Sequence, residues 1–157
     1  MKFLKITSII MALALFSGCA SLPKPEKMKT DIIGYELPQL PEEGKAIVYV
    51  VRPSEFGGLI RFNVFVDDKQ PTSEMGFTRG SQYIYFNLMP GNHEILSKAE
   101  NWAKLYITAN AGDIIFIQQD AKMGLFMTRN TLSQLPDYQG KYRVKHLELG
   151  TIIRANK

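Results

Sequence analysis

Short runs of β-branched and aromatic residues, separated by turn-forming residues, recur along the middle of the chain and constrain its fold most strongly. Residues 46–52 form a continuous apolar run, which is typical of a central strand with both faces buried. Residues 59–66 and 82–88 alternate between apolar and polar positions, which predicts strands with one face on a core. Further strands are expected at residues 93–98, 104–108 and 113–119.

Turn signals separate these runs at short spacing, and no long amphipathic helical pattern interrupts them. The turns are expected at Asp67-Asp68-Lys69, Pro90-Gly91 and Ala111-Gly112. This organisation predicts a mostly β chain, folded as a single antiparallel β-sandwich or barrel-like domain of about seven strands.

A short C-terminal helix is expected over residues 137–147. Tyr138, Tyr142 and Leu147 would line its inner face at helical spacing. Gly140 counts against this helix, because glycine destabilises a helix interior by about 1 kcal/mol relative to alanine.

The first 18 residues have the layout of a secretory signal peptide. Lys2 and Lys5 give a basic start, and residues 6–16 form an apolar stretch interrupted only by Thr7 and Ser8. A helix of that length spans about 16 Å, too short for a hydrocarbon core of about 30 Å. We therefore expect a cleaved signal peptide here and no transmembrane helix.

The run Leu15-Phe16-Ser17-Gly18-Cys19 resembles the lipobox of bacterial lipoproteins, with Phe16 where leucine is usual. The resemblance implies that Cys19 becomes the first mature residue, carries a diacylglycerol thioether and anchors the protein to the lipid bilayer. A residue other than aspartate after the cysteine, here Ala20, implies sorting to the outer membrane, facing the periplasm, in a cell with two membranes. The alternative is an ordinary secreted protein with an incidental cysteine. Because Cys19 is the only cysteine, an internal disulfide is excluded.

Residues 20–43 are rich in proline and charge and show little periodicity, which predicts an extended spacer. Within it, residues 32–37 could lie against the domain. The expected organisation is a signal peptide at 1–18, the lipidated cysteine and Pro-rich tether at 19–43, and the β domain at 44–157.

The charge balance argues against nucleic acid as a partner. The chain has 19 basic and 15 acidic residues, and removal of the signal peptide would take away Lys2 and Lys5, leaving a net charge of about +2. No cluster of lysine and arginine stands out along the sequence.

Several segments resemble DUF2846, a family of bacterial lipoproteins of unknown function. They are Val48–Pro53, Val64–Asp67, Pro90–His93, Lys122–Phe126, and a leucine strand followed by a Gly-Lys helix within Leu132–Lys145. Together they span residues 44–147, nearly the whole expected domain. The resemblance implies the fold and the cellular address, and it implies no activity, substrate or catalytic residue.

No sequence motif points to catalysis, a cofactor or a metal. The chain lacks a Gly-x-Ser-x-Gly elbow, a His-Glu-x-x-His motif, a phosphate loop and a dinucleotide fingerprint. His93 and His146 have no second ligand at metal-binding spacing, so a turn or surface role is favoured. Asp67 and Asp68 could attract calcium, but aspartate is also routine in turns. We expect no enzyme, no cofactor and no metal site.

Four aromatic residues are the candidate binding residues. Tyr83, Tyr85 and Tyr106 fall opposite the expected core faces, and Trp102 is expected in a turn. Outward aromatic rings can stack on sugars or anchor an interface, unless a second layer covers them. Met123 to Met127 raise a similar question, since they form either an exposed apolar loop or a strand packed on the C-terminal helix.

Three function classes remain. The favoured one is a membrane-anchored, non-enzymatic envelope module that binds a partner protein or has a structural role. The second is a glycan- or peptidoglycan-binding domain, suggested by the four aromatic residues. The third is a small hydrolase, for which no catalytic constellation was found.

Overall fold

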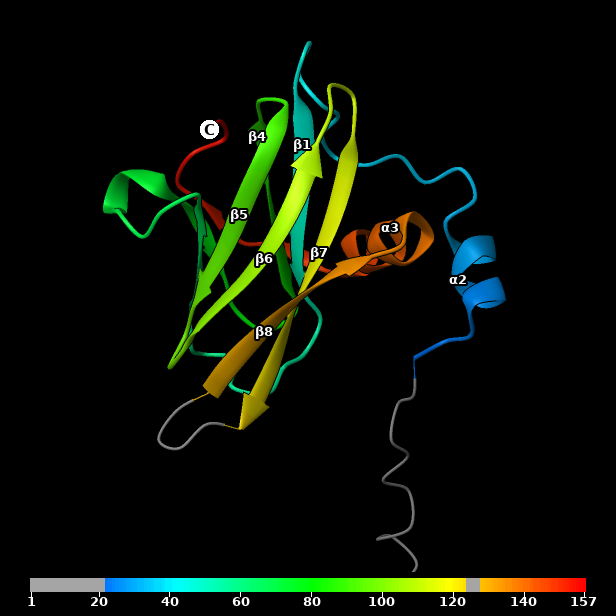
Figure 1. Ribbon diagram of the computed structural model, residues 1–157. Coiled ribbons are helices and arrows are strands. Elements are labelled where there is room, and N and C mark those ends of the chain that lie inside the picture. Colours follow the sequence, from blue (N-terminus) through cyan, green and yellow to red (C-terminus); the bar gives the residue numbers. More distant parts are fainter. Residues whose placement is uncertain (1–21, 124–127) are drawn as a thin grey trace, which may run out of the picture.

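The computed structural model describes residues 22–123 and 128–157 and shows two five-stranded sheets packed face to face (Figure 1). The first sheet has the order β8-β7-β1-β4-β9 and the second β10-β3-β2-β5-β6. The strands are β1 (Ala46–Arg52), β2 (Phe62–Val66), β3 (Glu74–Thr78), β4 (Gln82–Leu88), β5 (Gly91–Lys98), β6 (Trp102–Ala109), β7 (Ile114–Met123), β8 (Thr128–Leu135), β9 (Glu148–Leu149) and β10 (Thr151–Ile152). Helices α2 (Pro25–Asp31) and α3 (Asp137–His146) lie outside the first sheet, and η2 (Pro71–Ser73) is a single 3-10 turn.

The mostly β fold with a short C-terminal helix is confirmed, with two differences. The described residues form ten strands where about seven were expected. The two-residue β9 and β10 are too short to show a period, and β3 has none that is clear. The first sheet is mixed, since β1 pairs with β7 and β4 with β9 in parallel. β6 ends where β1 begins, so the chain turns at 110–113 and β7 must run in the direction of β1.

The core lies between the sheets. β1, β4 and β7 contribute one side of it and β2, β3, β5 and β6 the other. Val48 and Val50 of β1 and Phe86 of β4 are fully buried members, and Phe86 lies on the core face that the alternation in β4 predicts. A polar bridge crosses this core: Thr78 Oγ1 donates to Gln119 Oε1 (2.5 Å), and Gln119 Nε2 donates to Ser97 Oγ (2.8 Å). Because each of these buried groups has a partner, the bridge ties the two sheets together.

The outer face of the first sheet is covered by α3. Val144 and the buried Gly140 face the sheet, whereas Tyr138 and Tyr142 are only half-buried. The prediction that Tyr138 and Tyr142 line the inner face of this helix is therefore wrong. Leu147 does pack as predicted, against the cluster that contains Val144 and Phe116. Gly140 decides the rotation of the helix: a Cβ there would lie 2.0 Å from Cγ of Phe116 in β7. Only glycine lets the helix backbone approach this ring so closely.

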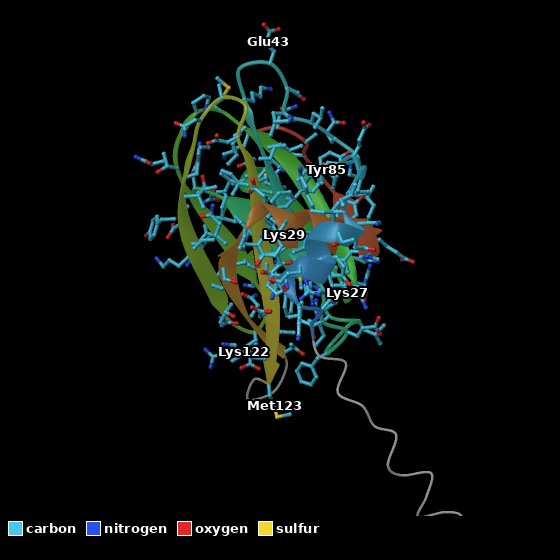
Figure 2. All side chains as sticks on the ribbon, turned by 90° about the vertical axis from the view of Figure 1, so that its right-hand side faces the viewer. Lys27, Lys29, Glu43, Tyr85, Lys122 and Met123 are labelled. Atoms are coloured by element: carbon cyan, nitrogen blue, oxygen red, sulfur yellow. The ribbon has the colours of Figure 1, made fainter. Side chains whose placement is uncertain are left out.

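Residues 20–43 were predicted to form an extended tether. In the described part of this segment, the chain instead forms a helix and packs on the domain. Pro25 starts α2, whose Met28 is 4% exposed, and α2 packs on α3 (Figure 2). Asp31 at the end of α2 bonds to His146 Nε2 (2.7 Å) and to Lys145 on α3. Farther along, the Tyr49 hydroxyl donates to Gln39 O (2.6 Å) and accepts from Gln39 N (3.0 Å). Contacts with α3 and β1 therefore order this segment, although its proline-rich composition predicts an extended spacer.

Candidate functional site

Tyr83 and Tyr85 on β4 lie on the outer face of the first sheet, where α3 and the segment before β1 cover them. Tyr83 is 7% exposed, and its ring centroid lies 6.1 Å from that of Tyr49. Tyr85 is half-buried, 5.6 Å from Tyr49 by the same measure. Burial also raises the pKa of Tyr83. A second layer thus packs over these two tyrosines, closing Tyr83 off from solvent and Tyr85 in part.

Trp102 and Tyr106 lie on β6, on the outer face of the second sheet. Tyr106 is 72% exposed, and the half-buried Trp102 packs on Phe65 with 5.3 Å between ring centroids. Within the described residues, α3 contacts β1 and β7, and no helix makes a comparable contact with this second sheet. The structure thus separates the four aromatic candidates into a covered pair and an open pair.

Lysine side chains surround the open pair. The Nζ atoms of Lys69 and Lys98 lie 4.8 Å and 4.9 Å from the centroid of the Trp102 ring. Lys104 Nζ lies 6.0 Å from the Tyr106 centroid and 3.2 Å from Glu94 Oε1. Hydrogen bonds from Tyr106 and Lys104 lower the pKa of Glu94. We call this surface the Trp102 face; it comprises Phe65, Lys69, Glu94, Lys98, Trp102, Lys104 and Tyr106.

A shallow cleft of about 420 Å³ adjoins the Trp102 face, sharing Phe65 and Lys98 with it. Asn63 at its floor donates to Glu74 Oε1 (2.6 Å), and Arg61 stands exposed at its rim. An aromatic platform with ammonium groups on two sides favours a ligand that combines an apolar or planar group with negative charge. The arrangement is suited to binding such a ligand.

His93 lines a second cleft, of about 500 Å³, with Asp67 and Tyr106. Its Nδ1 lies 3.0 Å from Asp67 Oδ2 and its Nε2 lies 2.9 Å from Met89 O. Both ring nitrogens of His93 are thus engaged by groups of the protein itself. His93 therefore ties the β4–β5 turn to the end of β2, which is the favoured turn role.

The calcium hypothesis for Asp67 and Asp68 finds no support in the geometry. Asp67 Oδ1 accepts from Glu94 N (3.1 Å), and Asp68 Oδ1 accepts from Gln70 N (2.8 Å). A hydrogen bond from Ser73 lowers the pKa of Asp68. Across residues 22–123 and 128–157, no three histidine, cysteine or acidic side chains come together in a way that could hold a metal ion.

Arg52 is a structurally important residue at the end of the strand that the apolar run 46–52 predicted. Its side chain is fully buried, with its guanidinium carbon 3.6 Å from the centroid of the Phe62 ring. It donates to the carbonyl oxygens of Ile60 (2.7 Å), Phe56 (3.0 Å) and Gly57 (2.8 Å). Burial lowers its pKa to about 10, so it stays charged at neutral pH. An arginine ending an otherwise apolar run was the available signal.

The 53–61 loop that Arg52 holds corrects the predicted strand over residues 59–66. The carbonyl groups of the loop bond to the guanidinium and not to a neighbouring strand, so β2 starts only at Phe62. Gly57 has φ +61, a backbone conformation that favours glycine.

The model of a family described as proteins of unknown function, DUF2846, matches residues 42–131, which run from just before β1 into β8. The chain belongs to the DUF2846 family. An uncharacterized protein of Haemophilus influenzae is 27% identical to it over 143 residues, which cover 90% of this chain and 82% of that protein. The segment that matches the family model, residues 42–131, includes β1, the Trp102 face and the His93 turn, so these features lie within the DUF2846 domain.

Cys19 lies outside the described residues, as do residues 124–127 of the Met123 to Met127 segment. Met123 itself is 82% exposed at the end of β7. None of the helices within residues 22–123 and 128–157 has the length and apolarity needed to cross a bilayer.

Proposed function

We propose that this DUF2846 protein is a non-enzymatic binding module of the cell envelope, anchored through acylated Cys19, which presents the Trp102 face to a partner protein. The observation that supports this most directly is the contrast between the two sheets. The outer face of the first is covered by α3, whereas the outer face of the second holds Tyr106 at 72% exposure and the lysines around Trp102. Exposed aromatic residues beside cations are typical of interface hot spots.

The anchor is supported by the Ser17-Gly18-Cys19 run behind an apolar stretch too short to span a bilayer. Cys19→Ala should abolish metabolic labelling with a fatty acid and leave the precursor uncleaved by the lipoprotein signal peptidase. Ala20→Asp is the matched control: it should keep the lipid label and, in a cell with two membranes, redirect the protein to the inner membrane. Labelling that persists in Cys19→Ala would show that the lipid is not on this sulfur.

The partner is tested by photo-crosslinking in intact cells from a benzoylphenylalanine at Tyr106, with Glu43 as the control position. Glu43 is also exposed but lies at one end of the sandwich (Figure 2). We expect a discrete protease-sensitive adduct from position 106 and none from 43. Trp102→Ala should weaken this adduct strongly, since truncating a hot-spot aromatic costs about 2 kcal/mol or more in binding.

The same experiment distinguishes a protein partner from a glycan, on which the ring of Trp102 could also stack. An adduct from position 106 that muramidase removes and protease leaves attached to cell-wall material would favour peptidoglycan over a protein. If the protein with the crosslinker at position 106 unfolds at the same midpoint as the wild type and still gives no adduct, both forms of the proposal are contradicted.

A further inference from the structure

One end of the sandwich gathers exposed apolar side chains. Leu59 is 92% exposed and Phe56 48% exposed, both in the 53–61 loop, and Met123 is 82% exposed at the end of β7. The loop and the β7–β8 hairpin touch: a Cβ on Gly57 would lie 2.1 Å from Oγ1 of Thr128, the first residue of β8. Figure 2 shows Lys122 and Met123 together at this end and Glu43 at the other. We call it the hairpin end; it comprises Phe56, Leu59, Arg79, Lys122, Met123 and Arg129.

Phe56 and Leu59 are exposed although the loop that carries them is fixed by hydrogen bonds. Arg52 binds three carbonyl oxygens of that loop, and Ser81 Oγ donates to Glu55 Oε1 (2.7 Å). Large apolar side chains displayed by a fixed loop mark a contact surface when they lie close together.

The charges of the hairpin end are mostly positive. Lys122 and Arg129 are exposed and face each other in the β7–β8 ladder. Arg79 is also exposed and lines one cleft with Leu59, where Glu55 is the acidic neighbour. Apolar side chains flanked by basic ones fit a bilayer interface with anionic headgroups, because the first enter the acyl boundary and the second pair with phosphates.

The start of the described chain lies close to this end. Leu22 and Pro23 line a cleft with Pro53 and Ser54, the first residues after β1. Leu22 is three residues beyond Cys19, a length of chain that reaches about 10 Å. A lipid on Cys19 would therefore bring the hairpin end, and not the Glu43 end, near the membrane.

We propose that the hairpin end inserts Phe56, Leu59 and Met123 into the headgroup region of an anionic lipid bilayer, so that the domain stands on its membrane in one orientation. This inference rests on the proposed Cys19 anchor, which keeps the domain at the surface and makes a weak contact effective. The long strands run between the two ends of the sandwich (Figure 1). In this orientation they would stand away from the membrane, and the Trp102 face would be open to a partner at the side.

The test uses the full-length exported protein, reconstituted into vesicles of phosphatidylethanolamine and phosphatidylglycerol. Single cysteines, Leu59→Cys and Met123→Cys, carry an environment-sensitive fluorophore, and Met89→Cys is the matched control. Met89 is 54% exposed in the turn after β4, at the end of the sandwich where β1 begins. We expect spin-labelled lipids to quench the probes at positions 59 and 123 severalfold more than the probe at 89. Equal quenching at all three would overturn the proposal.

Two further arms identify the source of a signal. Lys122→Glu with Arg129→Glu should reduce quenching at position 59 in the anionic vesicles and leave it unchanged in phosphatidylcholine vesicles; no change in either would contradict the role of the charges. Flotation of the unlabelled protein reports the anchor separately. Protein that floats without quenching at 59 and 123 refutes the orientation and leaves the anchor intact, whereas protein that does not float refutes both. Probes shielded in native envelopes but unquenched in vesicles would assign the hairpin end to a protein partner.

Discussion

Arg52→Ala is expected to destabilise the domain by about 3 to 5 kcal/mol, because it opens a cavity and leaves partly buried carbonyl groups without donors. The carbonyl oxygens of Phe56 and Ile60 both lose their bond to the guanidinium, and Phe62 loses the group packed on its ring. The shift is measured as the change in the free energy of unfolding in urea.

Two variants separate the causes of this loss. Arg52→Met restores most of the volume without donors, so it should recover only part of the stability. Arg61→Ala removes a neighbouring exposed arginine and should change the unfolding free energy by less than about 0.5 kcal/mol. An Arg52→Ala protein as stable as the wild type would show that the loop finds other donors and does not need this side chain.

Gly140→Ala is expected to destabilise the domain by about 2 to 3 kcal/mol, although alanine is the better helix former. The added Cβ would lie 2.5 Å from the Cβ of Phe116 as well as 2.0 Å from its Cγ. Because the near end of the Phe116 side chain cannot swing aside, α3 must lift from the first sheet. The midpoint of thermal unfolding should fall accordingly.

The control for this variant is Gln139→Ala, on the same helix and only half-buried. It should leave the unfolding midpoint nearly unchanged. Phe116→Ala removes the Cγ and Cδ1 atoms that the new Cβ would strike. If the two residues collide directly, combining it with Gly140→Ala should cost less than the sum of the two single changes. A rise in stability on Gly140→Ala alone, as helix propensity predicts, would contradict the packing described for α3.

Local patterns were sufficient to predict much of the secondary structure. The strands at 46–52 and 82–88 have the predicted bounds, and the C-terminal helix spans 137–146 where 137–147 was expected. These predictions succeed because side-chain alternation and β-branching act over a few residues. By contrast, the β3 segment contains Gly76 and has no clear period, so it is recognised as a strand only by its pairing with β2 and β10.

At the candidate site, the local sequence pattern does not predict which aromatic side chains are exposed. Tyr83 and Tyr106 both fall opposite the core by alternation, yet one is 7% and the other 72% exposed. Alternation tells which residues share a face, and it carries no information on whether another layer covers that face. That layer is α3, which comes from residues far along the chain.

The sequence by itself determined the β-rich class of the domain, its C-terminal helix and the family to which it belongs, because these follow from short periodic segments and their order. Only the tertiary structure decided that α3 covers the first sheet and α2 packs on α3, that the Trp102 face stays open, and that Arg52 and Gly140 carry structural roles. Burial of these groups depends on contacts between distant segments, such as Gly140 with Phe116, and such contacts exist only once the chain has folded.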